Sequence, residues 1–151
     1  MVKQIFDNFE KKRISRLILE SLPDWFGVPE AREDYIQGCV DQIFFAAFKE
    51  DQPIGFLCLK KTGKDTIELS VMGVLKEYHR QGIGRELFEA AKTTAKNNGY
   101  QFLQVKTVQM GKYAEYDITN HFYINMGFKE FEVFPKLWDE CNPCQIYIMS
   151  L

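Results

Sequence analysis

The sequence predicts a single α/β domain over residues 1–151, with about seven strands and about four helices. In several short segments apolar and polar residues alternate, which is typical of half-buried strands. In longer segments apolar residues recur every three or four positions, as expected for helices that pack on a sheet. A chain of 151 residues with 46% hydrophobic content is sufficient for one core, and no linker, repeat or low-complexity tract divides it.

The first half of the chain is expected to form one strand, two helices and then three strands. Asp7 or Asn8 is the predicted N-cap of the first helix, and Pro23 ends it. Pro29 suits the first position of a second, shorter helix. The expected elements are a strand at 2–6, helices at 9–22 and 29–37, and strands at 43–48, 54–60 and 66–74.

In the second half, helices and strands alternate. Gly99 and Gly127 stand where two helices should end, because glycine adopts the left-handed conformation of a helix terminator. The expected elements are a helix at 84–98, a strand at 102–108, a loop at 111–117, a helix ending at 126, and strands at 128–134 and 145–149 with a loop between them.

The junction between the strand at 66–74 and the helix at 84–98 predicts an anion site. Its glycines allow positive φ and a close approach of the backbone to a ligand. The first N–H groups of the helix have no intrahelical partners, and the helix dipole favours negative charge there. Two arginines add positive charge, so a pyrophosphate cradle is expected. The junction consists of His79, Arg80, Gln81, Gly82, Ile83, Gly84 and Arg85.

Two common phosphate loops do not fit this junction. A P-loop requires Gly-Lys-Ser/Thr, and here Gly84 is followed by Arg85 and Glu86. The dinucleotide fingerprint requires a third glycine where this chain has Leu87. The remaining pattern, Gly-x-Gly after a strand, resembles motif A of the GCN5-related N-acetyltransferase (GNAT) family, while a plain glycine-bearing loop stays open as the alternative.

A second segment strengthens the resemblance. Residues 122–128, Phe-Tyr-Ile-Asn-Met-Gly-Phe, are similar to motif B of the same family and follow Gly82 by about forty residues. The resemblance implies a mixed central sheet, acetyl-CoA as the cosubstrate, and direct transfer of its acetyl group to a primary amine. A homodimer is the assembly it favours. The family often carries asparagine where this chain has Tyr116.

Glu68 is the candidate general base. On a regular strand, Ile67, Leu69 and Val71 would face one side, with Glu68 and Ser70 on the other. The resemblance implies the base role, because the catalytic glutamate of the family's histone-acetyltransferase branch stands at the same distance before the same glycine as Glu68 does before Gly82. A lysine-like amine costs about 4.6 kcal/mol to deprotonate at pH 7, against about 1.4 kcal/mol for an α-amino group. A solvent-facing strand glutamate is the alternative.

The resemblance also implies roles for other residues along the cosubstrate path. Tyr123 of motif B is the candidate general acid for the departing thiolate, with simple packing on the helix as the alternative. The fourth and fifth strands are expected to separate, so that the open edge near Met72 and Val74 pairs with the pantetheine amides. Backbone N–H groups near Val74 are the expected oxyanion donors.

The acceptor is expected to approach through aromatic segments on either side of the cosubstrate. Aromatic rings accompanied by carboxylates suit an amine cation, although for any single residue ordinary packing or a solvated acid is the favoured interpretation. The net charge of −2 is compatible with a cationic acceptor. The candidate substrate residues are Trp25, Phe26, Tyr116 and Trp138.

Composition argues against several other functions. The charge of −2 gives no basic footprint for nucleic acid, and the sequence has neither a membrane span nor a signal peptide, so a cytoplasmic protein is expected. Cys141 and Cys144 form a C-x-x-C without the second ligand pair that a zinc site requires. Two further hypotheses stay open: a non-catalytic acyl-CoA sensor, and a thiol-redox protein using these cysteines.

Overall fold

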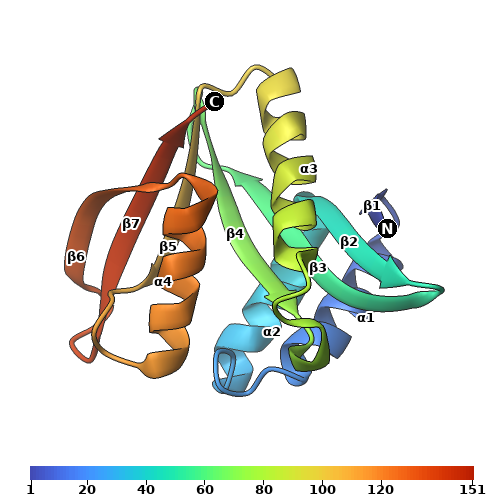
Figure 1. The fold of residues 1–151 in the computed structure, drawn as a ribbon, viewed down its shortest axis with the longest axis horizontal. Coiled ribbons are helices and arrows are strands. Elements are labelled where there is room, and N and C mark those ends of the chain that lie inside the picture. Colours follow the sequence, from blue (N-terminus) through green and yellow to red (C-terminus); the bar gives the residue numbers. More distant parts are fainter.

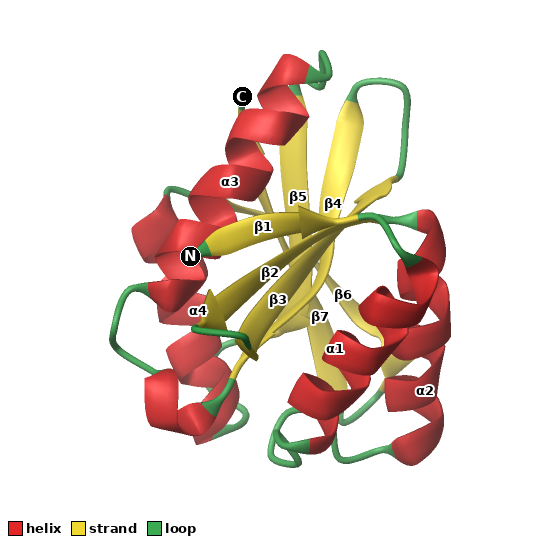
Figure 2. Ribbon diagram, turned by 90° about the vertical axis from the view of Figure 1, so that its right-hand side faces the viewer, coloured by secondary structure: helices red, strands yellow, loops and turns green.

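The computed structural model describes all residues 1–151 and contains one seven-stranded mixed sheet with helices on both faces (Figures 1 and 2). The strand order is β1-β2-β3-β4-β5-β7-β6, and only β4 and β5 pair in parallel. The strands are β1 (Val2–Ile5), β2 (Ile43–Lys49), β3 (Gln52–Lys61), β4 (Thr66–Val74), β5 (Phe102–Val108), β6 (Lys129–Asp139) and β7 (Asn142–Ser150). The helices are α1 (Asn8–Glu20), α2 (Pro29–Gly38), α3 (Ile83–Asn97) and α4 (Ala114–Met126), with short 3₁₀ turns η1 (Cys39–Asp41) and η2 (Lys76–Tyr78).

The sheet separates two hydrophobic cores, so the predicted α/β fold class and mixed sheet are confirmed. On one face α3 and α4 bury side chains such as Leu87 and Tyr123 against the sheet, and on the other α1 and α2 bury side chains such as Ile18 and Ile36 (Figure 2). Asp7 is the N-cap of α1, since its carboxylate accepts the Glu10 N–H at 2.9 Å.

A β-bulge in β4 corrects the expected side-chain pattern of this strand. Leu69 pairs with Leu59, but Val71 pairs with Cys58, so that Ser70 is the extra residue. Because a bulge reverses the alternation, Leu69 lies in the core under α3 and Val71 in the core under α1. The expectation that Ile67, Leu69 and Val71 share one face is therefore wrong at Val71.

Beyond the bulge, β4 and β5 separate. Their pairing runs only from Thr66 with Phe102 to Leu69 with Val105. The remainder of β4 stays paired with β3 as far as Val74, and β5 stays paired with β7. Figure 1 shows the two strands together at the top of the view and apart toward the bottom, which is the separation that the family resemblance implies.

The C-terminal region differs from the sequence prediction. The predicted loop between the last two strands does not exist, because β6 and β7 extend into a tight hairpin with Asp139 paired to Asn142. Pro135 is accommodated because β6 is an edge strand and its pairing with β7 is irregular after Phe134. Helix α4 begins at Ala114, so part of the predicted 111–117 loop is helical.

None of the helices combines the length and the apolar character needed to cross a membrane.

Candidate active site

A cavity of about 1060 Å³ occupies the space between the separated ends of β4 and β5. The α1–α2 loop, α2, the start of α3, α4 and the tip of the β6–β7 hairpin complete its wall. The cavity brings together residues predicted for both cosubstrate and acceptor. These are Trp25, Phe26, Met72, Val74, His79, Arg80, Gly82, Ile83, Gly84, Arg85, Tyr116, Tyr123 and Trp138.

The turn before α3 offers a run of free backbone donors at one end of the cavity. The His79 N–H donates to Lys76 O, and the next intrachain amide donor is Glu86, whose N–H reaches Gly82 O at 3.0 Å. The amides of residues 80–85 therefore have no partner within the chain. Arg80 and Gly82 both have positive φ, at 61° and 83°, which turns successive amides into a concave arrangement.

Side chains around this turn leave room for a ligand and supply positive charge. A Cβ on Gly82 would meet nothing within 4 Å, so open space lies beside the amides. Arg80 and Arg85 form no ion pair within the chain. Gly84 serves packing instead, because a Cβ there would approach the Phe122 ring of α4 to 3.1 Å.

The side chains of Gln81 and His79 both bond to main-chain carbonyls near the turn. Gln81 does not line the cavity, since its Nε2 donates to the Glu77 carbonyl at 3.0 Å. Its main-chain N–H belongs to the run of amides without a partner in the chain. The His79 Nε2 lies 2.6 Å from the Val74 carbonyl, so this nitrogen carries the proton and anchors the turn to the end of β4.

The exposed edge of β4 lines the cavity from the turn before α3 inward. Met72 and Val74 lie on the part of the strand that has lost its β5 partner, and both line the cavity. An extended ligand could add to this edge through main-chain hydrogen bonds. The Val74 carbonyl already accepts from His79, so a ligand pairing with this edge could not use that carbonyl.

Tyr123 reaches the cavity from α4. Its ring packs between Phe122, Phe128 and Tyr147, with the residue only 6% exposed. Every side-chain nitrogen or oxygen atom that is shielded from solvent has a hydrogen-bond partner. The Tyr123 hydroxyl has no partner within the chain, so it is not shielded. Because Tyr123 lines the cavity, its hydroxyl opens onto that cavity. Burial, followed by the nearby Tyr35 and Tyr116, raises the pKa of Tyr123 well above its usual value and keeps it protonated.

Asn120 holds in place α4, the helix that carries Tyr123. The sequence alone did not predict this role for Asn120. Its Nδ2 donates to Val108 O at 2.9 Å and Tyr116 O at 2.7 Å, while its Oδ1 accepts from the Tyr147 hydroxyl at 2.6 Å. The side chain is fully buried with every bond satisfied. A signal was available, because residues 116, 120 and 123 share one helix face and asparagine is unusual on a buried face.

Glu68 lies next to the cavity but does not contribute to its lining. Its side chain is 12% exposed, and its Oε1 accepts from the Lys106 Nζ at 2.8 Å. Lys106 on β5 lines the cavity, whereas Glu68 does not. Any proton exchange between an acceptor amine and Glu68 would therefore pass beside Lys106, another residue that the sequence analysis missed.

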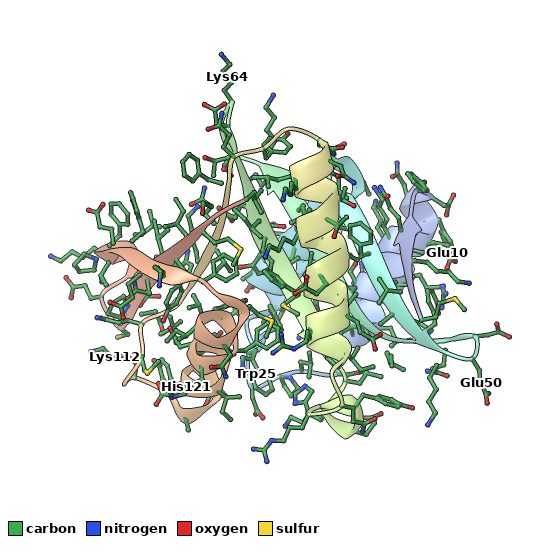
Figure 3. All side chains as sticks on the ribbon, turned by 45° about the horizontal axis from the view of Figure 1, so that its top comes forward. Glu10, Trp25, Glu50, Lys64, Lys112 and His121 are labelled. Atoms are coloured by element: carbon green, nitrogen blue, oxygen red, sulfur yellow. The ribbon has the colours of Figure 1, made fainter.

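Trp25 connects the two ends of the site. Its indole N–H lies 3.1 Å from the Glu115 carbonyl and 3.2 Å from the Thr119 hydroxyl, both on α4. Its ring meets the His79 ring edge-on, with centroids 5.9 Å apart. Figure 3 shows Trp25 between α4 and the turn before α3, so its side chain joins these two parts of the cavity wall.

The other predicted acceptor residues surround this loop. The Tyr116 hydroxyl donates to the Trp25 carbonyl at 2.8 Å, and Phe26 packs edge-on against Tyr35. Trp138 belongs to strand β6 rather than to a loop, and it lines the cavity with Asp139. The chain thus places aromatic rings from three separate segments around one opening.

The cysteines of the C-x-x-C lie in the β6–β7 hairpin. Cys141 is exposed in the turn and Cys144 is buried in β7. Burial raises the pKa of the Cys144 thiol to about 11, which disfavours the reactive thiolate at neutral pH. No cluster of three or more His, Cys, Asp or Glu side chains is arranged to hold a metal ion.

Comparisons with known proteins agree with this geometry. Residues 40–130 match the family model described as an acetyltransferase (GNAT) domain. An uncharacterized N-acetyltransferase of Chlorobaculum tepidum is 32% identical over 104 residues, which span 67% of this chain and 61% of that relative.

Solved structures show the same fold. A GNAT-family acetyltransferase structure from Desulfovibrio desulfuricans has a TM-score of 0.84 at 22% identity, covering 99% of this chain and 98% of the other. An aminoglycoside 6'-N-acetyltransferase complexed with coenzyme A has a TM-score of 0.75 at 15% identity, covering 99% and 96%. The family model matches more than half of the chain, and the protein belongs to the GNAT acetyltransferase family.

Proposed function

We propose that the protein transfers the acetyl group of acetyl-CoA directly to a primary amine. The observation that carries this proposal is the run of unpartnered amides at residues 80–85, which opens onto the same cavity as the free edge of β4. A diphosphate would accept from these amides, with Arg80 and Arg85 neutralising its charge. The structure of an aminoglycoside 6'-N-acetyltransferase of the same fold, solved in complex with coenzyme A, supports this choice of cosubstrate.

The thioester of acetyl-CoA would supply the acetyl group, and the residues of this chain would manage the protons. The protonated Tyr123 hydroxyl would donate to the departing sulfur. Glu68 would accept the proton of the amine through water beside Lys106, since the carboxylate itself does not line the cavity. Amides near Val74 would stabilise the developing oxyanion.

The acceptor proposed here is a small-molecule or peptide amine in its cationic form. Trp25, Phe26, Tyr116 and Trp138 provide ring faces around the opening, and Glu115 and Asp139 provide carboxylates in the same wall. An amine cation is attracted both by aromatic faces and by carboxylates. Aminoglycosides are one class to test, because an aminoglycoside acetyltransferase shares the fold.

Thiol release from acetyl-CoA across a panel of amines tests the proposal. Turnover with at least one amine, and acetyl-CoA binding measured by calorimetry, are expected. Binding of acetyl-CoA without turnover on any amine would favour a non-catalytic acyl-CoA sensor. The position of Glu68 behind Lys106 supports this alternative function. Absence of binding would exclude both functions.

A further inference from the structure

Lys106 is the only lysine that lines the cavity between β4 and β5. It follows Val105, the last residue of β5 that pairs with β4, so it stands where the two strands begin to separate. The Lys106 side chain is 31% exposed, and its only hydrogen bond is donated by Nζ to the Glu68 carboxylate. The chain therefore places an amine of its own inside the cavity that an acceptor amine would enter.

The side chains of Glu68 and Lys106 lie on the sheet face that α1 and α2 cover. Their neighbours Leu69 and Val105 belong to the core under α3, and side chains alternate along a strand, so Glu68 and Lys106 point to the opposite face. Trp25, a predicted acceptor residue, packs against the core on that opposite face. An acceptor that passes Trp25 would therefore approach from the face on which Lys106 already stands.

We propose that Lys106 is a self-acetylation site, to which the protein transfers the acetyl group of acetyl-CoA when no other acceptor is present. This inference rests on the proposed function, since it uses the same cosubstrate and the same base. A lysine amine is protonated at neutral pH and must lose a proton before it can attack a thioester. Glu68 contacts the Lys106 ammonium directly at 2.8 Å, whereas an external amine would reach Glu68 only through water.

The transfer balances with groups that the cavity already holds. Glu68 takes one proton from the Lys106 ammonium, and the neutral Nζ attacks the carbonyl carbon of the thioester. The C–N bond forms as the C–S bond breaks, and the sulfur leaves with the electron pair of the broken bond. Tyr123 gives its proton to the sulfur and recovers one from the new amide nitrogen through water. The products are acetylated Lys106, coenzyme A and the proton that Glu68 releases to solvent.

Lys60 on β3 is a matched comparison within the same sheet. It is the cross-strand partner of Glu68, so the two side chains emerge on the same face. Lys60 is exposed, forms no ion pair and does not line the cavity. Modification of Lys106 but not of Lys60 would therefore distinguish transfer inside the cavity from the general reactivity of surface lysines.

Intact-mass spectrometry with acetyl-CoA and no added amine tests the proposal. The wild-type protein should gain one acetyl group, about 42 Da, and peptide mapping should locate it on Lys106. Lys106→Arg, which keeps a cation beside Glu68, should stay unmodified, whereas Lys60→Arg should gain the group as wild type does. Glu68→Gln should slow the gain roughly 10²-fold, because no carboxylate then takes the proton of the ammonium. Circular dichroism checks that the variants are folded.

Protein unfolded in urea measures the intrinsic reactivity of its lysines with acetyl-CoA, and it should show no preference for Lys106. An unchanged mass of the folded wild-type protein would overturn the proposal. A gain spread over several lysines, or an equal gain in Lys106→Arg, would overturn it too, because the acetyl group would then lie elsewhere. Thiol release across the amine panel separates the two failures. Turnover of an external amine with an unchanged protein mass removes only self-acetylation, whereas the absence of both also removes the proposed function.

Discussion

The ammonium group of Lys106 lies 2.8 Å from the carboxylate of Glu68, just where β4 and β5 stop pairing. This ion pair joins the two strands at the base of the cavity and keeps a largely buried carboxylate satisfied. It also determines how Glu68 could act in catalysis, because the lysine and not the glutamate lines the cavity.

The first prediction concerns Glu68 as a base. Glu68→Gln should lower kcat/KM at pH 7 by roughly 10²-fold for an alkylamine with a pKa near 10.4. The loss should be clearly smaller for an α-amino acceptor near pKa 8, which gives up its proton more readily. Steady-state thiol release with both amines measures the difference, and Glu77→Gln, outside the cavity, is the control. Equal rates for Glu68→Gln and wild type on both amines would remove Glu68 from the mechanism.

The second prediction concerns the diphosphate cradle. Gly82→Asp should weaken acetyl-CoA binding at least roughly tenfold, because a carboxylate would enter the space beside the free amides. Gly99→Asp is a matched control, since Gly82 and Gly99 flank the two ends of α3, both have positive φ, and neither has an atom within 4 Å of a built Cβ. Titration calorimetry should find wild-type affinity for Gly99→Asp. Equal affinity of both variants for acetyl-CoA would refute the cradle.

The third prediction separates chemistry from binding at Tyr123. Tyr123→Phe should lower kcat by roughly 10²-fold, because the departing sulfur loses its donor, with little change in affinity for acetyl-CoA. The ring stays in place among Phe122, Phe128 and Tyr147, so the fold should be retained. Tyr113→Phe, another tyrosine in the cavity wall, is the control. An unchanged kcat would show that the hydroxyl donates nothing in the rate-limiting step.

Local sequence signals predicted most of the fold and the backbone conformation of the turn before α3. Hydrophobic periodicity locates elements because each strand or helix must bury one face, and it found the order of all seven strands and four helices. The glycine-bearing turn was also predictable, because its glycines and the start of the following helix are adjacent in the chain. Gly82 indeed adopts the positive φ that only glycine takes without strain.

What the sequence did not predict depends on pairing between distant segments. The bulge at Ser70 arises from the register of β4 against β3, so no local pattern indicates that Val71 changes face. The contact between Lys106 and Glu68 joins residues 38 positions apart. The extension of β6 through Pro135 is possible only because β6 lies at the edge of the sheet, which is a property of the topology.

The fourth prediction concerns Asn120. Asn120→Ala should lower the free energy of unfolding by about 3 kcal/mol, because the buried Tyr147 hydroxyl loses its acceptor and the Val108 carbonyl loses a donor. Urea denaturation measures the loss. Asn125→Ala on the same helix, whose side chain makes no hydrogen bond within the chain, should change stability by less than about 0.5 kcal/mol. Similar losses for both variants would mean that the Asn120 bonds are not what secures α4.

The fifth prediction concerns stability at alkaline pH. Burial, with Tyr35, Glu115 and Tyr113 nearby, raises the pKa of Tyr116 from 10.0 to about 12. Between these values the unfolded chain releases the phenolic proton while the folded chain keeps it, so the free energy of unfolding falls as pH rises from about 10 to about 12. Below pH 10 both states hold the proton, and the contribution is fully present.

Replacing the phenol isolates this contribution. Tyr116→Phe should be less stable than wild type at pH 8, because the hydroxyl no longer donates to the Trp25 carbonyl, by about 1 kcal/mol. Between pH 10 and 12 its stability should fall less steeply, by up to about 1.4 kcal/mol per pH unit. Urea midpoints across this range measure both effects, with Tyr100→Phe, outside the cavity, as the control. Parallel curves for Tyr116→Phe and wild type would mean that the Tyr116 phenol ionises equally in the folded and unfolded states, and that burial in the fold does not raise its pKa.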